Sequence, residues 1–267
     1  MEPDRYTHGH HESVLRSHVW RTADNSAGYL LPELRPGLDL LDVGCGPATL
    51  TADLATLVAP GRVVAVDNAP AVLDVARRTL AERGRTAVEV RQADVYDLPF
   101  SDDSFDVVHA HQLLQHLADP VAALEELRRV CRPGGVVAAR DADYPAMAWY
   151  PEDPALERWR ALYVAVARSN GAEPGAGRRL LAWARRAGFA EVEPSASVWC
   201  HATAEDRAWW GGLWAERITS SAVADQALAA GLADRRDLEE LAAAWRRWAA
   251  SPEGWFAVLH GEVRCRG

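Results

Sequence analysis

Lysine is absent from this sequence, and all 29 basic residues are arginines. Without lysine the chain has no Walker-type phosphate loop, and it cannot form a Schiff base with a carbonyl substrate or with pyridoxal phosphate. Cysteine is scarce, and the four that occur (Cys45, Cys131, Cys200 and Cys265) lie far apart without a CxxC motif. We therefore expect neither a zinc cluster nor a disulfide framework.

Long apolar runs and basic blocks are also missing. No stretch approaches the roughly twenty apolar residues of a membrane span, and the polar N-terminus does not resemble a secretory signal. The formal net charge of -9 opposes binding to nucleic acid or to anionic membrane surfaces. We expect a cytoplasmic protein whose partner is a small molecule.

The first half of the chain alternates short β-branched runs with helical periods. Apolar runs at 38–43, 62–67, 88–94, 105–110 and 135–141 read as strands, with helices at about 48–58, 70–83 and 121–131. Repeated βα units of this kind predict a parallel sheet, and nearly continuous apolar strands predict burial on both faces. The expected fold class is a doubly wound, mostly parallel α/β sheet of the Rossmann type.

The second half has a different pattern. Helices are expected at 154–169 and 178–188, then a strand at 189–199 that Pro194 places away from the sheet centre or breaks in two. We divide the chain into an N-terminal helical lid segment (1–36), an α/β core (37–202) with a helical insertion near 151–170, a tryptophan-rich helical cap (203–252) and a final strand of the core (253–267). The cap is expected to cover the carboxyl edge of the sheet.

The loop "LLDVGCGPAT" (40–49) ends the first strand with two bare positions, Gly44 and Gly46. A ligand can lie against such a backbone, near the N-terminus of the following helix. A nicotinamide or flavin fingerprint needs its third glycine at position 49, which is Thr49; Ala48 instead suits a GxGxG-like turn. Asp67, at the end of the second strand, is placed to accept hydrogen bonds from two ribose hydroxyls.

Polar residues follow the ends of successive strands: Asp42, Asp67, Asp94, His109 or His111, and Asp141. The carboxyl ends of parallel strands share one edge of a sheet, which is where ligands bind in this fold class. The sequence thus predicts one polar site along that edge.

Five segments in order, "LLDVGCGPAT", "VVAVDNAP", "QADVYDLPF", "SFDVVHAHQLLQHLADP" and "LRRVCRPGGVV", resemble the class I S-adenosylmethionine-dependent methyltransferases of the ubiquinone/menaquinone C-methyltransferase-like group. The resemblance covers about residues 37–141. It implies S-adenosylmethionine as cofactor and S-adenosylhomocysteine as product. It also implies that the following residues contact the cofactor: Asp42, Gly44, Cys45, Gly46, Asp67, Asn68, Ala93, Asp94, Val95 and His111.

One position departs from the family pattern, which has glycine where this chain has Ala48. Alanine tolerates a right-handed helical backbone but not its mirror image, so binding is expected to survive unless this residue needs a positive φ. In related enzymes the helix before the first strand covers the cofactor. We therefore expect Arg21 to meet the cofactor carboxylate and Tyr29 to stack beside it.

Candidate general bases are His116, His111 and Asp141, followed by His109 and Asp143. Each also has a structural interpretation: a histidine bonded to nearby backbone, a core histidine, or an acid capping a turn. A second histidine cluster, His8, His10 and His11, has the residue type of a metal site, but a disordered or lid-like terminus is the preferred interpretation. No metal is expected.

Six of the 11 tryptophans lie between 209 and 255: Trp209, Trp210, Trp214, Trp245, Trp248 and Trp255. Leu241, Trp245 and Trp248 share one helical face, which indicates packing of the cap on the body. The alternative is that one or more tryptophans line a pocket for an apolar or aromatic acceptor, or hold a cation. Both can hold together.

These observations predict an enzyme that transfers a methyl group from S-adenosylmethionine to a small organic acceptor. One alternative is a protein that binds this cofactor without methyl transfer, as a regulatory binder or a rearrangement enzyme. A further alternative, an NAD-dependent oxidoreductase, is opposed by Thr49. The sequence leaves the acceptor, the methylated atom, the use of a general base and the oligomeric state open.

Overall fold

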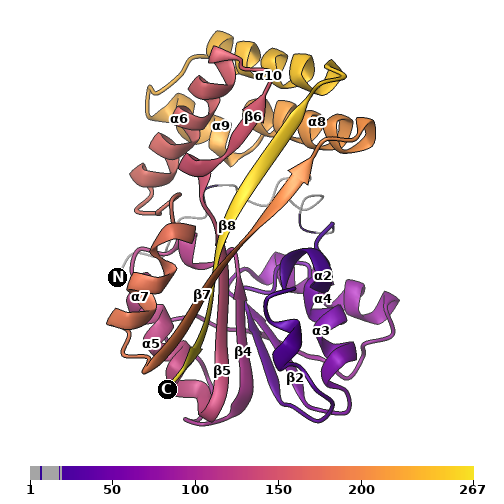
Figure 1. Cartoon of the computed structure of the whole chain (residues 1–267), viewed down its shortest axis with the longest axis vertical. Helices are drawn as coiled ribbons and strands as arrows, with labels where there is room; N and C mark the ends of the chain where they lie inside the picture. Colours follow the sequence, from indigo (N-terminus) through magenta and orange to yellow (C-terminus); the bar gives the residue numbers. More distant parts are fainter. Residues whose placement is uncertain (1–6, 8–17, 19) are drawn as a thin grey trace.

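The computed structural model describes residues 7, 18 and 20–267, which form an α/β lobe and a smaller helical lobe joined by two long strands (Figure 1). A single sheet has the order β3-β2-β1-β4-β5-β8-β6, with β7 pairing on the other side of β8. The first five strands pair in parallel and β8 is antiparallel to β5, which confirms the expected fold class. The strands are β1 Leu40–Val43, β2 Val63–Asp67, β3 Glu89–Gln92, β4 Phe105–His111, β5 Cys131–Ala142, β6 Ala148–Tyr150, β7 Glu191–His201 and β8 Trp255–Arg266.

Helices cover both faces of the sheet in the α/β lobe (Figure 1). One face packs against α2 (Ala23–Ser26) and α3 (Thr49–Val58), with α4 (Pro70–Glu82) beside them, and the other against α5 (Pro120–Val130) and α7 (Leu180–Arg186). Burial on both faces explains why β1 and β2 each carry a single polar residue among apolar ones. Single 3-10 turns complete the connections: η1 Leu31–Glu33, η2 Leu114–His116, η3 Tyr144–Ala146 and η4 Gly177–Arg179.

The second lobe consists of four helices around a tryptophan core. Its helices are α6 Pro154–Ser169, α8 Ala204–Ser220, α9 Ala222–Ala229 and α10 Arg235–Ala250. The ring of Trp159 lies 4.5 Å from that of Trp214 and 4.8 Å from that of Trp245, edge to face in both pairs. Since Trp159 belongs to α6, this helix packs with the cap although the chain reaches it much earlier.

β7 and β8 pair over their whole length and carry the sheet from one lobe into the other. β7 continues through Pro194, which lies opposite Val263, so the strand is not broken in two. It occupies the outer edge of the sheet, where a residue without an N–H donor is tolerated. The short edge strand β6 was not predicted.

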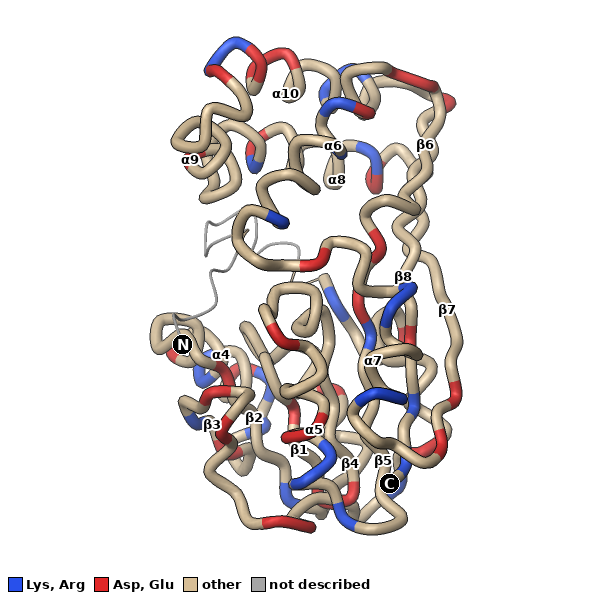
Figure 2. The backbone as a smooth tube through the Cα atoms, turned by 90° about the vertical axis from the view of Figure 1, so that its left-hand side faces the viewer, with Lys and Arg blue, Asp and Glu red and all other residues tan. Residues whose placement is uncertain are grey.

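Acidic and basic residues are interspersed over both lobes rather than gathered by sign (Figure 2). Among the described residues, no helix is both long and apolar enough to cross a membrane.

Candidate active site

A cavity of about 360 Å³ opens at the carboxyl edge of the sheet, where the helical lobe faces the core. This volume lies within the range of small-molecule sites. The loops that follow β1, β2, β3 and β4 form its core side. Tyr144, Met147, Trp210 and Arg217 form the cap side, together with residues of the long strands.

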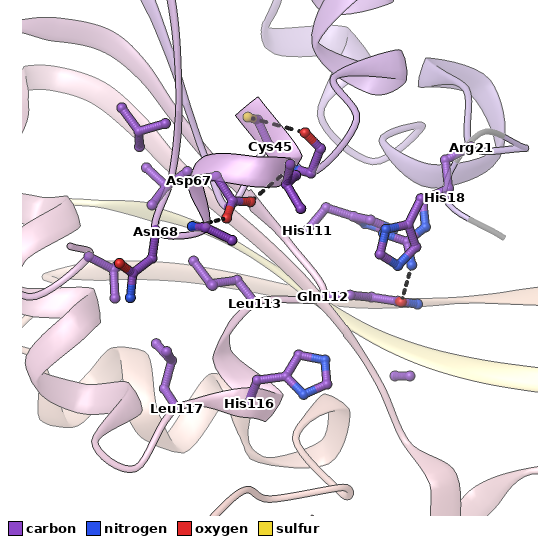
Figure 3. Close-up of a pocket in the computed structure, with 18 of the residues that line it drawn as sticks. His18, Arg21, Cys45, Asp67, Asn68, His111, Gln112, Leu113, His116 and Leu117 are labelled. Carbon is purple, nitrogen blue, oxygen red and sulfur yellow. Dashed lines mark hydrogen bonds between the residues drawn. The ribbon is translucent and has the colours of Figure 1, made fainter. Parts of the chain in front are cut away.

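The cavity brings together most of the predicted site residues (Figure 3). Its walls include His116 and ten residues expected near a cofactor: Arg21, Gly44, Cys45, Gly46, Asp67, Asn68, Ala93, Asp94, Val95 and His111. The chain segments that carry them are far apart in sequence, and they meet because parallel strands end at one edge.

Asp67 is fixed by the backbone around it. Its two carboxylate oxygens accept hydrogen bonds from the N–H groups of Gly46 and Ala69, each at 3.0 Å. A carboxylate has about four acceptor positions, so this side chain can still accept hydrogen bonds from donors of a ligand.

Burial raises the pKa of the neighbouring Cys45 thiol well above its usual value, so that side chain is uncharged.

Two glycines in this loop have left-handed backbone conformations, which favour glycine. Gly44 has φ +71° and a Cβ added there would lie 3.0 Å from Leu113, while Gly46 has φ +54°. Ala48 also has a left-handed backbone, with φ 59°, at the residue that caps α3. At this position, where the family has glycine, the left-handed backbone is unfavourable for alanine. The sequence alone did not show whether this residue needs a positive φ.

Tyr29, Asp42 and Asp141 do not line the cavity. Tyr29 is half-buried and packs against the apolar cluster between the sheet and α2, and burial of its hydroxyl raises the pKa of that group well above its usual value. Asp42 accepts a hydrogen bond from Thr51 and lies 2.8 Å from Nδ1 of His109, inside the sheet. These positions disagree with the expected cofactor contacts of Tyr29 and Asp42.

Asp141 supports the cavity from behind. Its carboxylate accepts hydrogen bonds from backbone N–H groups of η2, with an N–O distance of 3.1 Å to Gln115. Burial raises the pKa of this carboxyl to about 7. Asp141, expected as a catalytic residue, therefore lies behind the turn that carries His116 and not on the cavity wall. Asp143 is likewise engaged elsewhere, in a two-bond ion pair with Arg178.

Two of the three histidines that line the cavity, His111 and His116, are held in the neutral state. Burial and then the charge of Arg21 lower the pKa of His116 to about 3. Burial is also the largest cause for His111, followed by Arg21 and Arg140, and its pKa falls well below the usual value. Both imidazoles are weak bases as a result.

A hydrogen-bonded relay that the sequence did not reveal orients Arg21. Nδ1 of His260 lies 3.0 Å from the carbonyl oxygen of Val258, so Nδ1 donates and Nε2 accepts. Nε2 of Gln112 donates to that ring nitrogen at 2.8 Å, and Oε1 of Gln112 accepts from Arg21 at 2.6 Å (Figure 3). Gln112 adopts φ 52°, a strained conformation typical of functional sites.

The cap side of the cavity combines aromatic rings with one buried cation. Trp199 and Trp210 line it, so only one of the six tryptophans highlighted in the sequence reaches the site. Arg217 is 3% exposed, and its guanidinium lies 4.7 Å from the ring centre of Trp214. An arginine on an amphipathic helix normally faces solvent, which is why Arg217 could not be identified as a site residue from the sequence.

His8, His10 and His11 lie outside the described residues. Within the part of the chain that is described, no group of three or more His, Cys, Asp or Glu side chains is arranged to hold a metal ion.

Comparisons with known proteins agree with this geometry. A family model described as a methyltransferase domain matches residues 41–139. A Schizosaccharomyces pombe protein described as an uncharacterized methyltransferase is 35% identical over 97% of this chain and 95% of its own length. The demethylmenaquinone methyltransferase of Desulfitobacterium hafniense is 34% identical over 45% of this chain and 48% of its own.

Solved structures show the same fold. The YcgJ protein of Bacillus subtilis matches 90% of this chain and 97% of its own, with a TM-score of 0.57 and 18% identity. The [4+2]-cyclase SpnF matches 97% of this chain and 88% of its own, with a TM-score of 0.53 and 22% identity. The full-length relative, the family model and the fold agree, and this chain therefore belongs to the class I S-adenosylmethionine-dependent methyltransferases, in the group similar to the ubiquinone and menaquinone C-methyltransferases.

Proposed function

We propose that the chain holds S-adenosylmethionine in the core half of the cavity and transfers its methyl group to a small apolar or aromatic acceptor in the cap half. The observation that carries this proposal is that both carboxylates on the cavity wall lie on one side of it, opposite the aromatic side chains. Asp67 and Asp94 lie in the core half, whereas Arg217 and the aromatic side chains lie in the cap half.

The residues of the core half fit this cofactor. Gly44 and Gly46 have no side chains, so the cofactor can approach the backbone closely there. Asp67 can accept hydrogen bonds from ribose hydroxyls, and Asp94 can accept one from an exocyclic amine. Arg21, at the other end of the core half of the cavity, has a guanidinium that suits the carboxylate of the cofactor. The cofactor would supply a methyl group already activated by a sulfonium. The protein's own task is then to exclude water and to align the acceptor. His18 and Arg21 close one side, which supports a lid role for the N-terminal segment.

Asp67→Ala tests the placement of the nucleoside. We expect the variant to bind S-adenosylhomocysteine at least about tenfold more weakly in calorimetry, because each lost charge-assisted hydrogen bond is worth more than the free energy of a tenfold change. Asp74→Ala, which removes an exposed carboxylate on α4 outside the cavity, serves as the matched control. Unchanged affinity in Asp67→Ala would place the ribose elsewhere.

Release of S-adenosylhomocysteine separates methyl transfer from binding alone. Incubation with S-adenosylmethionine and a panel of apolar and aromatic phenols, acids and amines should yield this product with at least one acceptor. Tight binding of the cofactor with no product from any acceptor class would favour the alternative of a binder without transfer.

A further inference from the structure

We propose that Gln112 and His260 are positioning residues for the methionyl end of the cofactor. They hold the guanidinium of Arg21 where it meets the cofactor carboxylate, so that tight binding depends on the amino-acid part of the ligand. This inference rests on the proposed function and assigns a role to two residues that contact neither the nucleoside nor the acceptor. Arg21 and Gln112 line the cavity, whereas His260 is fully buried.

The buried end of the relay fixes its direction. Nδ1 of His260 lies 3.0 Å from the carbonyl oxygen of Val258, which can only accept, so Nδ1 carries the proton and Nε2 is an acceptor. The amide nitrogen of Gln112, which can only donate, lies 2.8 Å from that acceptor. If the amide turned over, its carbonyl oxygen would face the lone pair of the ring nitrogen. His260 therefore keeps Oε1 of Gln112 directed at Arg21.

The guanidinium of Arg21 is held from two sides. Oε1 of Gln112 accepts a hydrogen bond from its Nη2 at 2.6 Å (Figure 3), and the guanidinium carbon lies 5.9 Å from the ring centre of Trp199. Trp199 packs in turn on the ring of His260 at 4.3 Å. A guanidinium has five N–H donors, so the bond to Gln112 is compatible with a contact to a carboxylate.

The backbone of Gln112 agrees with a positioning role. Its φ of 52° lies in the left-handed region, which costs free energy in any residue except glycine and is concentrated at functional sites. Its N–H donates to the carbonyl oxygen of Arg140 at 2.7 Å, which holds the residue in place directly after β4. The bonds of the side chain give a reason for a glutamine at a position where glycine would be unstrained.

Holding a long side chain in its binding geometry before the ligand arrives strengthens binding, because less conformational entropy is lost on association. For one such side chain the gain in affinity is roughly threefold to tenfold. Only a ligand that carries the carboxylate can benefit from it.

The experiment compares two ligands of the full chain by calorimetry. S-adenosylhomocysteine has the amino-acid part, and 5'-methylthioadenosine has the same nucleoside and sulfur without it. We expect Gln112→Met and His260→Phe each to weaken S-adenosylhomocysteine by about threefold to tenfold and to leave 5'-methylthioadenosine within about twofold of the wild type. A variant that only disturbed the fold would weaken both ligands.

A double variant tests whether Gln112 acts through Arg21. If it does, Arg21→Met combined with Gln112→Met should bind S-adenosylhomocysteine within about twofold of Arg21→Met alone. Gln92→Met is the matched control, because the amide of Gln92 donates to the carbonyl oxygen of Asn68 at 3.0 Å and does not line the cavity. This control should leave the ratio of the two affinities unchanged.

Four results would overturn the inference: equal weakening of both ligands, unchanged affinity for S-adenosylhomocysteine in Gln112→Met, no loss in Arg21→Met, or additive losses in the double variant. The double variant needs only S-adenosylhomocysteine, so it decides even where 5'-methylthioadenosine binds too weakly to measure. Failure of S-adenosylhomocysteine to bind the wild type would instead overturn the proposed function.

Discussion

Ala48 illustrates how one residue can balance opposing energies. Its left-handed backbone costs about 1–2 kcal/mol relative to glycine. Its methyl group is fully buried against α3 and α4, which contributes about 0.8 kcal/mol, and alanine restricts the unfolded chain more than glycine does. The favourable and unfavourable contributions are of similar size, which explains how the family's glycine can be replaced here.

Ala48→Gly is therefore expected to change the free energy of unfolding by less than about 1 kcal/mol. Ala52→Gly is the matched control on the same helix. Ala52 is 2% exposed in the helix interior, so glycine there loses the methyl contact and helix propensity without relieving strain, at a cost of about 2 kcal/mol. Urea unfolding of the two variants measures the difference. Equal losses would show that the Ala48 backbone is not strained.

At the scale of the element, the turn η2 depends on the end of β5. The carboxylate of Asp141 accepts hydrogen bonds from the backbone N–H groups at the start of this turn. The turn places Leu113, His116 and Leu117 on the cavity wall. Removing a buried acceptor leaves backbone donors unsatisfied. The effect of Asp141 on the site is thus transmitted through η2.

Asp141→Ala should destabilise the protein by about 1–3 kcal/mol and weaken binding of S-adenosylhomocysteine. Asp141→Asn keeps an acceptor oxygen for η2, so we expect it to retain most of the affinity and of the turnover with any acceptor identified. Calorimetry and single-turnover rates test both variants. Full binding with lost turnover in Asp141→Asn would instead mean that the carboxylate takes part in the chemistry.

The core side of the site was predictable because it follows from the order of strands. A residue directly after a buried strand, such as Asp67 or Asp94, must lie at the carboxyl edge whatever the rest of the chain does. Asp42 does not reach the cavity wall, for a related reason: it is the third residue of the four-residue β1, and its side chain turns into the sheet toward His109. Periodicity locates a strand but does not tell which side chains leave it toward a ligand.

The cap side was not predictable in the same way. Tyr144, Trp199 and Arg217 come from a 3-10 turn, an edge strand and a helix, and tertiary packing alone brings them together. Gln112 gave no signal because its importance depends on a positive φ and on His260, nearly 150 residues away. Tryptophan-rich helices predicted a packed cap, and packing explains Trp214, Trp245 and Trp248.

At the scale of the whole molecule, buried neutral histidines link stability to pH. Burial is the largest cause that lowers the pKa of His111, His116, His201 and His260 below the ordinary value of 6.5. The unfolded chain therefore binds more protons than the folded one once the pH falls below about 6.5, and folding loses stability toward acid. Asp141 acts in the opposite direction, because its raised pKa makes the folded state take up a proton first between about pH 7 and 4.

His201 provides the sharpest test of this linkage. Its pKa falls to about 4, its ring stacks on Trp210, and both of its ring nitrogens are buried without hydrogen bonds. Between pH 7.5 and pH 5 this one residue should remove about 2 kcal/mol from the free energy of unfolding. His201→Phe keeps an aromatic ring of similar shape that cannot take up a proton. Urea unfolding should show that the variant loses about 2 kcal/mol less than the wild type over this pH interval, and equal losses would mean that His201 is already solvated or paired in the folded state.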